Sequence, residues 1–258
     1  ATNEKLIHTH HNSHNGRIKV WMGLENLYYC SEKMYRDALR LQKNFGIGIH
    51  THGPEQEEEE QFIINKFGKS SRDMMEERGI LGEKTLLAHC VWVNNNDIIK
   101  LAATGTNVAH CPTSAAKLGC GIAPIPAMLR QGVNVSIGTD GNIDNNSMDM
   151  FQEMKFASLL QKAAHCDASL MKAPEMLRMA TINGAKSLNM EDEIGSIEVG
   201  KSADIILVDV FTPNLQPIYW NKQEDETNLL WNLVFSSRGS DVNTVMVQGN
   251  ILLRDGKA

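Results

Sequence analysis

The sequence lacks several features that would mark particular classes of protein. Its longest apolar runs are well under the roughly 18 residues that a membrane span needs. The polar residues 1–5 are not followed by the apolar core of a signal peptide. The net charge is -6 and no cluster of Lys and Arg occurs, which argues against a nucleic-acid-binding surface. We therefore expect a cytoplasmic protein that binds neither nucleic acid nor a membrane.

The cysteines follow no pattern of a disulfide framework or a thiolate metal site. The five are odd in number, scattered and never spaced as C-x-x-C: Cys30, Cys90, Cys111, Cys120 and Cys166. Such usage is typical of reduced thiols in a cytosol. The chain of 258 residues has an ordinary globular composition, with 42% hydrophobic and 22% charged residues. Its length suits one barrel, or part of a barrel with an accessory domain.

Strand-like and helix-like segments alternate from about residue 17 to residue 190. Short apolar runs predict strands at residues 17–22, 46–52, 85–89, 106–110 and 133–140. Amphipathic segments between and after them predict helices at residues 31–46, 62–67, 74–78, 97–103, 125–131 and 148–162. This alternation is typical of a parallel sheet wrapped by helices.

The pattern changes after residue 190. Strands are predicted at residues 194–197, 203–210 and 242–253, with Gly, Pro and Asp turns and no helix between most of them. The last of these contains a plausible hairpin turn at 248–250. We therefore expect one domain over residues 1–190 and a β-rich segment over residues 191–258.

Three of the predicted parallel strands end in a titratable side chain. His52 ends one strand and precedes Glu55 by three residues, and His89 and Asp140 end two later strands. Polar residues at the carboxyl ends of successive strands are typical of the catalytic face of a (β/α)8 barrel. Histidine nitrogen and carboxylate oxygen are ligands that a catalytic zinc with an open position prefers. These residues predict a metal-dependent hydrolase.

Each of these residues also has a structural interpretation. His50 lies on the same sheet face as His52, because side chains alternate with period two, although the His-x-x-Glu spacing favours His52. His89 could be a core histidine, and Asp140 could be a turn residue before glycine. His110 is either a hydrogen-bonding residue near the site or a structural one. The histidines His8, His10, His11 and His14 are expected to form a polar helix end and loop.

A series of motifs occurs in one order over nearly the whole chain. The series comprises His52-x-x-Glu55, residues 87–91, 110–114, 118–124, 138–141, 145–151, 180–185 and 195–204. Together they resemble the amidohydrolase superfamily, in particular its branch of S-adenosylhomocysteine/5-methylthioadenosine deaminases and s-triazine chlorohydrolases.

The resemblance implies an α/β fold, a (β/α)8 TIM barrel of which this chain shows strands 4 to 8, followed by part of a small β-sandwich. The first strands, with a His-x-His pair that supplies two ligands, are not in this chain. His52 and Asp140 match ligands of one divalent metal, zinc or iron. His89 matches the residue that hydrogen-bonds the attacking water or the oxyanion. Glu55 matches the acid/base that carries the water proton to the leaving group.

The resemblance also implies hydrolytic deamination of an aromatic N-heterocycle such as an adenosine derivative, in a protein that is often a homo-oligomer. Glu25 stands where the deaminases usually carry a substrate-contacting histidine, and with His110 it is a candidate for substrate binding. Gly53-Pro54 replaces the commoner Leu-Ser pair before Glu55. Hydrolysis of a substituted triazine or pyrimidine and a non-catalytic scaffold remain as alternatives.

Overall fold

The computed structural model describes residues 2–221 and 226–257. The chain divides into two compact units. The first unit comprises Ala1–Ala109 with Ala127–Asn134, and the second comprises His110–Pro126 with Val135–Ala258. No helix in the described residues combines the length and the apolar character that a membrane crossing requires.

A five-stranded sheet has the strand order β1-β2-β3-β4-β5, and its strands are β1 Met22–Gly23, β2 Ile49–His52, β3 Thr85–Ala88, β4 Asn107–His110 and β5 Val135–Ile137. Pairing is parallel from β1 to β4, and His52 is in register with Ala88. All four residues of β3 are buried, as expected for a parallel strand covered on both faces. The parallel sheet predicted from the alternating pattern is confirmed.

The strand predicted at residues 17–22 is wrong over most of its length. Only Met22 of that stretch belongs to β1. Ile18 instead forms an antiparallel bridge with Ser13, and its carbonyl accepts the N–H of Asn12 at 2.8 Å. This local turn satisfies the backbone groups that a longer strand would have used.

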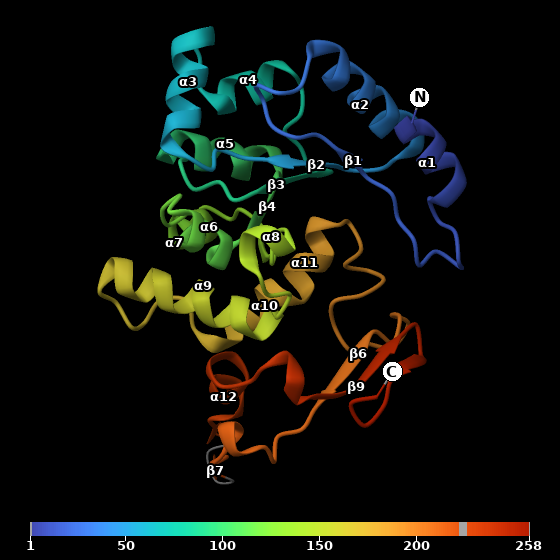
Figure 1. Ribbon diagram of the computed structural model, residues 1–258, viewed down its shortest axis with the longest axis vertical. Coiled ribbons are helices and arrows are strands. Elements are labelled where there is room, and N and C mark those ends of the chain that lie inside the picture. Colours follow the sequence, from blue (N-terminus) through green and yellow to red (C-terminus); the bar gives the residue numbers. More distant parts are fainter. Residues whose placement is uncertain (1, 222–225, 258) are drawn as a thin grey trace. The chain divides into compact units, whose positions relative to one another are not determined.

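The first unit contains the helices α1 Thr2–His10, α2 Glu32–Phe45, α3 Glu57–Phe67, α4 Ser71–Glu77 and α5 Asn95–Thr104. Ser31 caps α2 by accepting the N–H of Met34, and Gly46 ends it with a left-handed φ of 67°. Helices α1 and α2 lie side by side (Figure 1), where Arg40 donates to Glu4 at 3.4 Å. Turns follow α1, as expected for the histidine-rich helix end and loop.

A close contact at Gly48 leads to a stability prediction. A Cβ atom added at Gly48 would lie 2.3 Å from the Trp21 ring, whereas one added at Gly23 would meet nothing within 4 Å. Because overpacking forces neighbouring atoms to shift, Gly48→Ala is expected to lower the free energy of unfolding by about 1–3 kcal/mol. Urea unfolding of Gly48→Ala and of the control Gly23→Ala tests this. Equal losses in the two variants would contradict it.

The second unit is mainly helical before residue 190. Its helices are α6 Pro112–Leu118, α8 Asn142–Asn145, α9 Met150–His165, α10 Ala173–Ala180, α11 Ile182–Ser187 and α12 Leu229–Phe235, while α7 Ile125–Arg130 crosses the unit boundary. The long helix predicted at residues 148–162 is present as α9. Asp149 caps it by accepting the N–H groups of Phe151 and Gln152.

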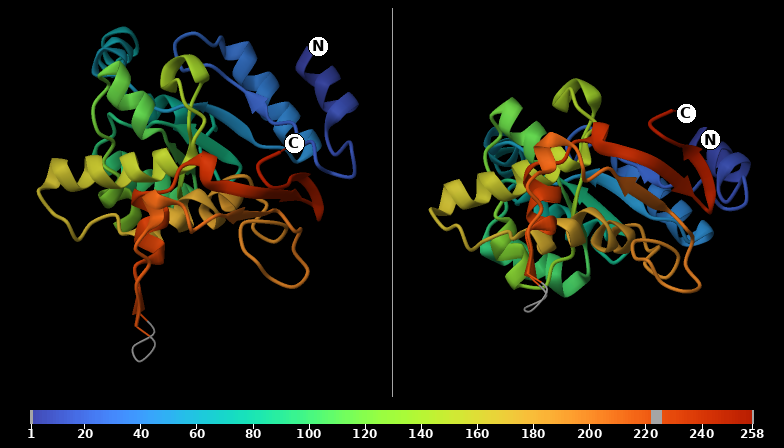
Figure 2. Two further views of the ribbon diagram at one scale, coloured as in Figure 1. Left: turned by 60° about the horizontal axis from the view of Figure 1, so that its bottom comes forward. Right: turned by 90° about the horizontal axis from the view of Figure 1, so that it is seen from below.

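The C-terminal part contains an antiparallel sheet with the order β10-β9-β6. Its strands are β6 Ile205–Val208, β9 Val242–Val247 and β10 Asn250–Leu253, and Figure 2 shows the red hairpin paired with the orange strand β6. Gln248 and Gly249 have positive φ values of 47° and 76°, so the predicted hairpin turn is confirmed. A separate pair joins β7 Trp220–Asn221 and β8 Glu226–Thr227.

One expectation for this C-terminal part is wrong. Residues 194–197 form no strand: the N–H of Ile194 donates to Met190, and Gly195 has a left-handed φ of 92°. The segment between β8 and β9 contains the helix α12, for which no element was predicted. Val234 is its buried residue, so tertiary packing accounts for a helix that the short apolar run did not reveal.

Candidate functional site

The ring orientation of His52 is fixed by a backbone carbonyl. Its Nδ1 lies 2.7 Å from the carbonyl oxygen of Glu25. A carbonyl can only accept, so Nδ1 carries the proton and the lone pair of Nε2 is left for another partner. Histidine metal ligands commonly donate their second ring N–H in this way. His52 therefore has the tautomer that a metal ligand through Nε2 requires.

Glu25 contributes through its backbone, which sequence reasoning did not predict. Its carbonyl also accepts the N–H of His52 at 3.1 Å and the hydroxyl of Thr51 at 3.0 Å. The Glu25 side chain is exposed, and its predicted contact with substrate stays a prediction. No signal in the amino-acid sequence marks such a contact, because every residue type carries the same carbonyl group.

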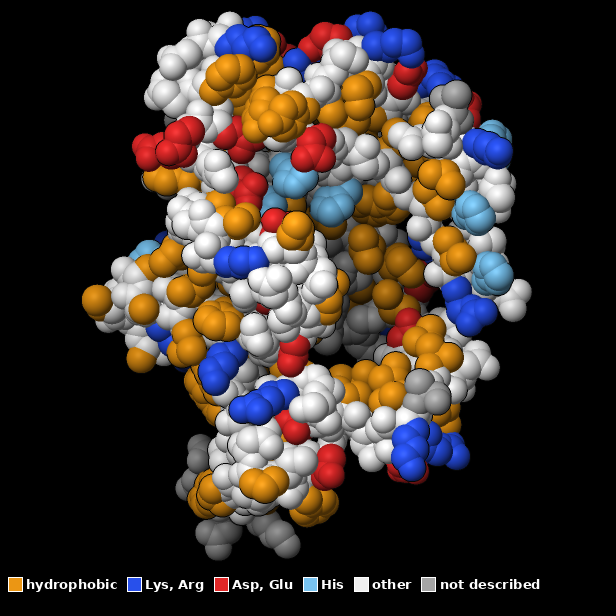
Figure 3. Space-filling model, viewed as in Figure 1, with side chains coloured by type: hydrophobic (Ala, Val, Ile, Leu, Met, Phe, Trp, Pro, Cys, Tyr) orange, Lys and Arg blue, Asp and Glu red, His pale blue; other side chains and the backbone are white. Residues whose placement is uncertain are grey.

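His89 lies beside His52 and Glu55 in the first unit. The His52 and His89 rings are stacked with centroids 5.4 Å apart, and Nδ1 of His89 is 3.8 Å from a carboxylate oxygen of Glu55. His89 is buried and has a left-handed φ of 66° just after β3. Histidine side chains reach the surface of this unit beside acidic ones (Figure 3). Three of the predicted site residues are thus brought together.

The turn between His52 and Glu55 needs a glycine. A Cβ atom at Gly53 would lie 2.4 Å from Sγ of Cys90, and the N–H of Gly53 donates to Ala88 at 2.8 Å. Burial raises the pKa of the Cys90 thiol to about 12, so this cysteine is a neutral packing residue at ordinary pH. The Gly-Pro pair noted in the sequence therefore brings the two strand ends close together.

The acidic run at residues 55–60 leads into and forms the first turn of α3, and most of it was expected from the sequence to be a solvated face, but two of its residues have partners in the fold. Glu59 accepts the N–H of Glu55 at 3.4 Å, and burial raises the pKa of its carboxyl group. Glu60 accepts the N–H of Ser71 at 3.1 Å. Tertiary partners brought by the fold account for the difference.

Asp140 is held by two hydrogen bonds in the second unit. Ser114 Oγ donates to Oδ2 of Asp140 at 2.5 Å, and the N–H of Gly141 donates to Oδ1 at 2.6 Å. Asp140 has a left-handed φ of 63°, just beyond the end of β5. His110 is also in this unit, buried at the end of β4, and its carbonyl accepts the N–H of Gly138 at 2.9 Å. The predicted roles of both residues stay predictions.

A buried pair, Asn145 and Glu153, fixes the loop that carries Asp140. The Asn145 amide donates to the Thr139 carbonyl at 2.6 Å and to Oε1 of Glu153 at 2.7 Å. The N–H of Thr113 donates to the other Glu153 oxygen at 3.4 Å. Glu153 is fully buried on α9, and sequence reasoning missed it. In the sequence, the position of Glu153 between the apolar residues Phe151 and Met154 indicated that its side chain lies on the buried face of the helix.

The buried Glu153 carboxyl predicts a pH effect on stability. Burial raises the pKa of Glu153 above 4.5, opposed by the hydrogen bonds from Thr113 and Asn145 and reinforced by Asp140. As the pH rises through 4.5 toward the folded pKa, the unfolded chain ionises first, so the native state loses stability. In the variant Glu153→Gln the side chain at this position cannot ionise, so the variant should not lose stability in this way as the pH rises. Urea unfolding of metal-free wild type and metal-free Glu153→Gln, measured as the pH rises from 4.5, tests this prediction. A difference in the free energy of unfolding between the two proteins that does not change with pH would contradict it.

Two relatives among the curated proteins are named as deaminases. The chain is 40% identical over 251 residues to 5-methylthioadenosine/S-adenosylhomocysteine deaminase of Thermoanaerobacter pseudethanolicus, covering 97% of this chain and 56% of that protein. It is 39% identical over 253 residues to 5'-deoxyadenosine deaminase of Methanothermobacter thermautotrophicus, covering 98% and 57%. The chain thus spans little more than half the length of these relatives.

Solved structures have the same fold. An adenosine deaminase from Xanthomonas campestris with bound zinc superposes with a TM-score of 0.92 at 28% identity, covering 99% of this chain and 56% of the other. Atrazine chlorohydrolase TrzN from Arthrobacter aurescens, complexed with zinc, gives 0.90 at 22% identity, covering 99% and 55%. This second likeness shows the fold alone.

These neighbours confirm the α/β class and a fold like that of a TIM barrel. A sequence model of the Amidohydrolase family matches residues 1–252. The match covers nearly the whole chain, in agreement with the series of motifs. The chain belongs to the Amidohydrolase family.

Proposed function

We propose that this protein is a metal-dependent hydrolase that removes the amino group of an adenosine derivative. The observation that carries the proposal is the His52 ring, whose Nδ1–H is bound by the Glu25 carbonyl and whose face lies against His89. Relatives named as deaminases support this chemistry. The triazine alternative has weaker support, because the likeness to TrzN shows the fold alone.

His52 and Asp140 are the proposed ligands of one divalent metal, zinc first and iron second. The donor set fits: an imidazole with its Nε2 lone pair available and a carboxylate are ligands that both metals accept. Zinc is named as bound in the related Xanthomonas and Arthrobacter structures. A metal held there would lower the pKa of a bound water toward about 7.

Glu55 is proposed to move the proton of the attacking water. A carboxylate beside that water can take its proton and return it to the leaving amine, which is otherwise a poor leaving group. His89 is proposed to hydrogen-bond the attacking oxygen, because its ring lies within 3.8 Å of Glu55 and stacks on His52. Asp140 would also hold a water proton, and Glu25 and His110 are proposed to contact the substrate.

The finer organisation is proposed on the same grounds. The five strands are assigned to strands 4 to 8 of an eight-stranded barrel, within a domain of residues 1–190. Residues 191–258 are assigned to part of a β-sandwich. The superposition of 99% of this chain on 56% of a longer deaminase supports both assignments. A cytoplasmic location and a homo-oligomer stay predictions.

Metal content and ammonia release test the proposal. The purified full-length gene product is analysed for zinc and iron, and then incubated with 5'-methylthioadenosine, S-adenosylhomocysteine, 5'-deoxyadenosine, guanine and atrazine. One equivalent of metal that is lost in Asp140→Ala but kept in the exposed control Asp192→Ala, with ammonia released from the adenosine derivatives, is the expected result. Stoichiometric metal that does not depend on Asp140 would overturn the ligand assignment. Absence of stoichiometric metal would favour the non-catalytic scaffold.

A further inference from the structure

The Glu153 side chain lies where three segments of the second unit meet. It is completely buried on α9, and each of its two carboxylate oxygens accepts a hydrogen bond from a different segment. One of these segments is α6, which packs against both α8 and α9 (Figure 1). The other is the segment 139–145, which begins next to Asp140 and ends in α8. A buried carboxyl group is costly unless it is hydrogen-bonded, so this junction depends on both partners.

One oxygen of Glu153 holds the start of α6. The N–H groups in the first turn of a helix have no partner within the helix. Cys111, the residue before α6, makes no side-chain hydrogen bond to that turn, and the N–H of Thr113 donates to Oε2 of Glu153 at 3.4 Å. The next residue in this turn is Ser114, whose Oγ donates to Oδ2 of Asp140 at 2.5 Å. Glu153 therefore anchors the turn that holds one oxygen of the Asp140 carboxylate.

The other oxygen of Glu153 holds the backbone next to Asp140. Oε1 accepts the side-chain amide of Asn145 at 2.7 Å, and the same amide donates to the carbonyl of Thr139 at 2.6 Å. A side-chain amide has two hydrogens, so Asn145 can make both bonds at once. Thr139 immediately precedes Asp140, whose φ of 63° is left-handed. Because this conformation is uncommon outside glycine, the fixed Thr139 carbonyl supports the direction in which the Asp140 side chain leaves the backbone.

We propose that Glu153 is a positioning residue for Asp140, which it holds through Ser114 on the side of the carboxylate and through Asn145 on the side of the backbone. The inference rests on the proposed role of Asp140 as a metal ligand. Hydrogen-bonded groups behind a metal ligand orient it, and their loss commonly lowers metal affinity about 10–100-fold. Glu153 touches neither metal nor substrate in this role and acts only through its two neighbours.

The zinc affinity of the full-length gene product tests the inference, measured with zinc alone in competition with a chromophoric chelator. Glu153→Gln keeps the size of the side chain but replaces one acceptor oxygen with a donor, so it can hold only one of the two partners. This variant and Asn145→Ala are each expected to weaken zinc binding about 10–100-fold.

Ser158→Ala is the matched control for a general loss of stability. Ser158 is also fully buried on α9, and its hydroxyl donates to the carbonyl of Met171 at 2.7 Å. The variant therefore loses a buried hydrogen bond of the same helix, but it should bind zinc as wild type does. An equal loss of zinc affinity in Ser158→Ala and Glu153→Gln would overturn the inference, because the effect would then reflect stability alone.

Amide hydrogen exchange of the metal-free proteins supplies a readout that does not depend on zinc. The N–H of Gly141 donates to Oδ1 of Asp140 at 2.6 Å, so residues 139–145 should exchange faster in Glu153→Gln than in wild type or Ser158→Ala. If zinc is lost in Asp140→Ala but binds normally to Glu153→Gln, the inference is wrong and the proposed function stands. If zinc binding is indifferent to Asp140→Ala, the ligand assignment fails, and faster exchange in Glu153→Gln alone still supports the positioning role.

Discussion

Glu55→Gln is expected to lower kcat for deamination about 10²–10⁴-fold, the usual contribution of a positioned acid/base group. Glutamine keeps the shape and one acceptor oxygen but cannot take a proton from water. Glu55 is not one of the proposed metal ligands, so the variant should retain its metal. The measurement is steady-state kinetics on 5'-methylthioadenosine together with metal content, from the same preparation of each protein.

Glu58→Gln is the matched control for this experiment. Glu58 lies in the same acidic run, on the exposed side of α3, and the same change there should leave kcat unaltered. A variant with normal kcat, or one that loses its metal, would contradict the role assigned to Glu55.

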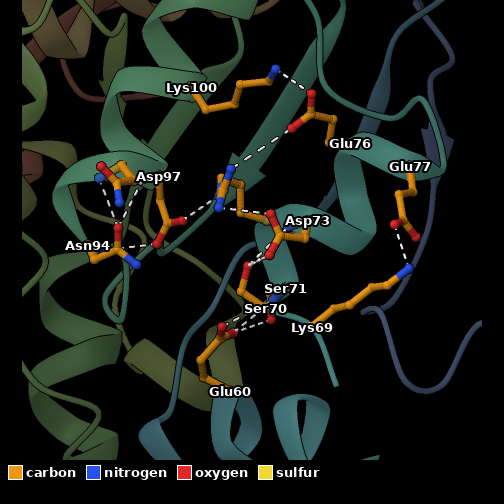
Figure 4. A network of polar contacts seen from close by, with 12 residues as sticks. Glu60, Lys69, Ser70, Ser71, Asp73, Glu76, Glu77, Asn94, Asp97 and Lys100 are labelled. Atoms are coloured by element: carbon orange, nitrogen blue, oxygen red, sulfur yellow. Dashed lines mark hydrogen bonds and ion pairs between the residues drawn. The ribbon is translucent and has the colours of Figure 1, made fainter. Parts of the chain in front are cut away.

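Asp97→Asn is expected to lower the free energy of unfolding by about 1–3 kcal/mol, because the buried side chain loses charge-assisted hydrogen bonds, although Arg72 keeps its ion pair with Asp73 at 2.8 Å. The Asp97 side chain is 7% exposed, and its two oxygens accept Nε of Arg72 and the N–H of Asn94, each at 2.8 Å. The second bond completes the capping box of α5. Figure 4 shows Asp97 and Asn94 at the start of that helix, joined to the polar groups of α4.

Glu76→Gln is the control, because Glu76 belongs to the same network but is 45% exposed and lies 3.9 Å from the Arg72 guanidinium. Exposed ion pairs contribute about 0–1 kcal/mol, so this variant should unfold close to wild type. Urea denaturation followed by circular dichroism measures both variants. Similar losses in the two would show that Asp97 acts as an ordinary surface charge.

The sequence predicted the elements whose signals are local. Ser31 and Gly46 mark the two ends of α2, and the alternation of His50 and His52 follows from the period of a strand. Residues 194–197 were predicted wrongly, and no element was predicted at residues 229–235, because short apolar runs do not distinguish a strand from a helix or a packed turn. There the tertiary environment decides the backbone conformation.

The chemistry of the site could be predicted only in part. The residue types at the strand ends indicated metal and proton transfer, and the structure places His52, Glu55 and His89 together in the first unit. The groups that orient them could not be predicted. The role of the Glu25 carbonyl cannot be predicted from the type of residue, because every residue has a backbone carbonyl. The contacts of Glu153 with Asn145 and Thr113 form only when α9 packs against the rest of its unit.

The left-handed backbone at His89 and Asp140 has a consequence for directed evolution. Most non-glycine residues in this conformation cost about 1–2 kcal/mol relative to glycine, and Asn and Asp cost less because their side chains form local hydrogen bonds, as Asp140 does with the N–H of Gly141. A library selected only for heat resistance should therefore accumulate glycine or asparagine at positions 89 and 140. Selection for turnover should keep histidine and aspartate there. The two selections should diverge first at these two positions, so a consensus drawn from heat-selected clones would lose activity.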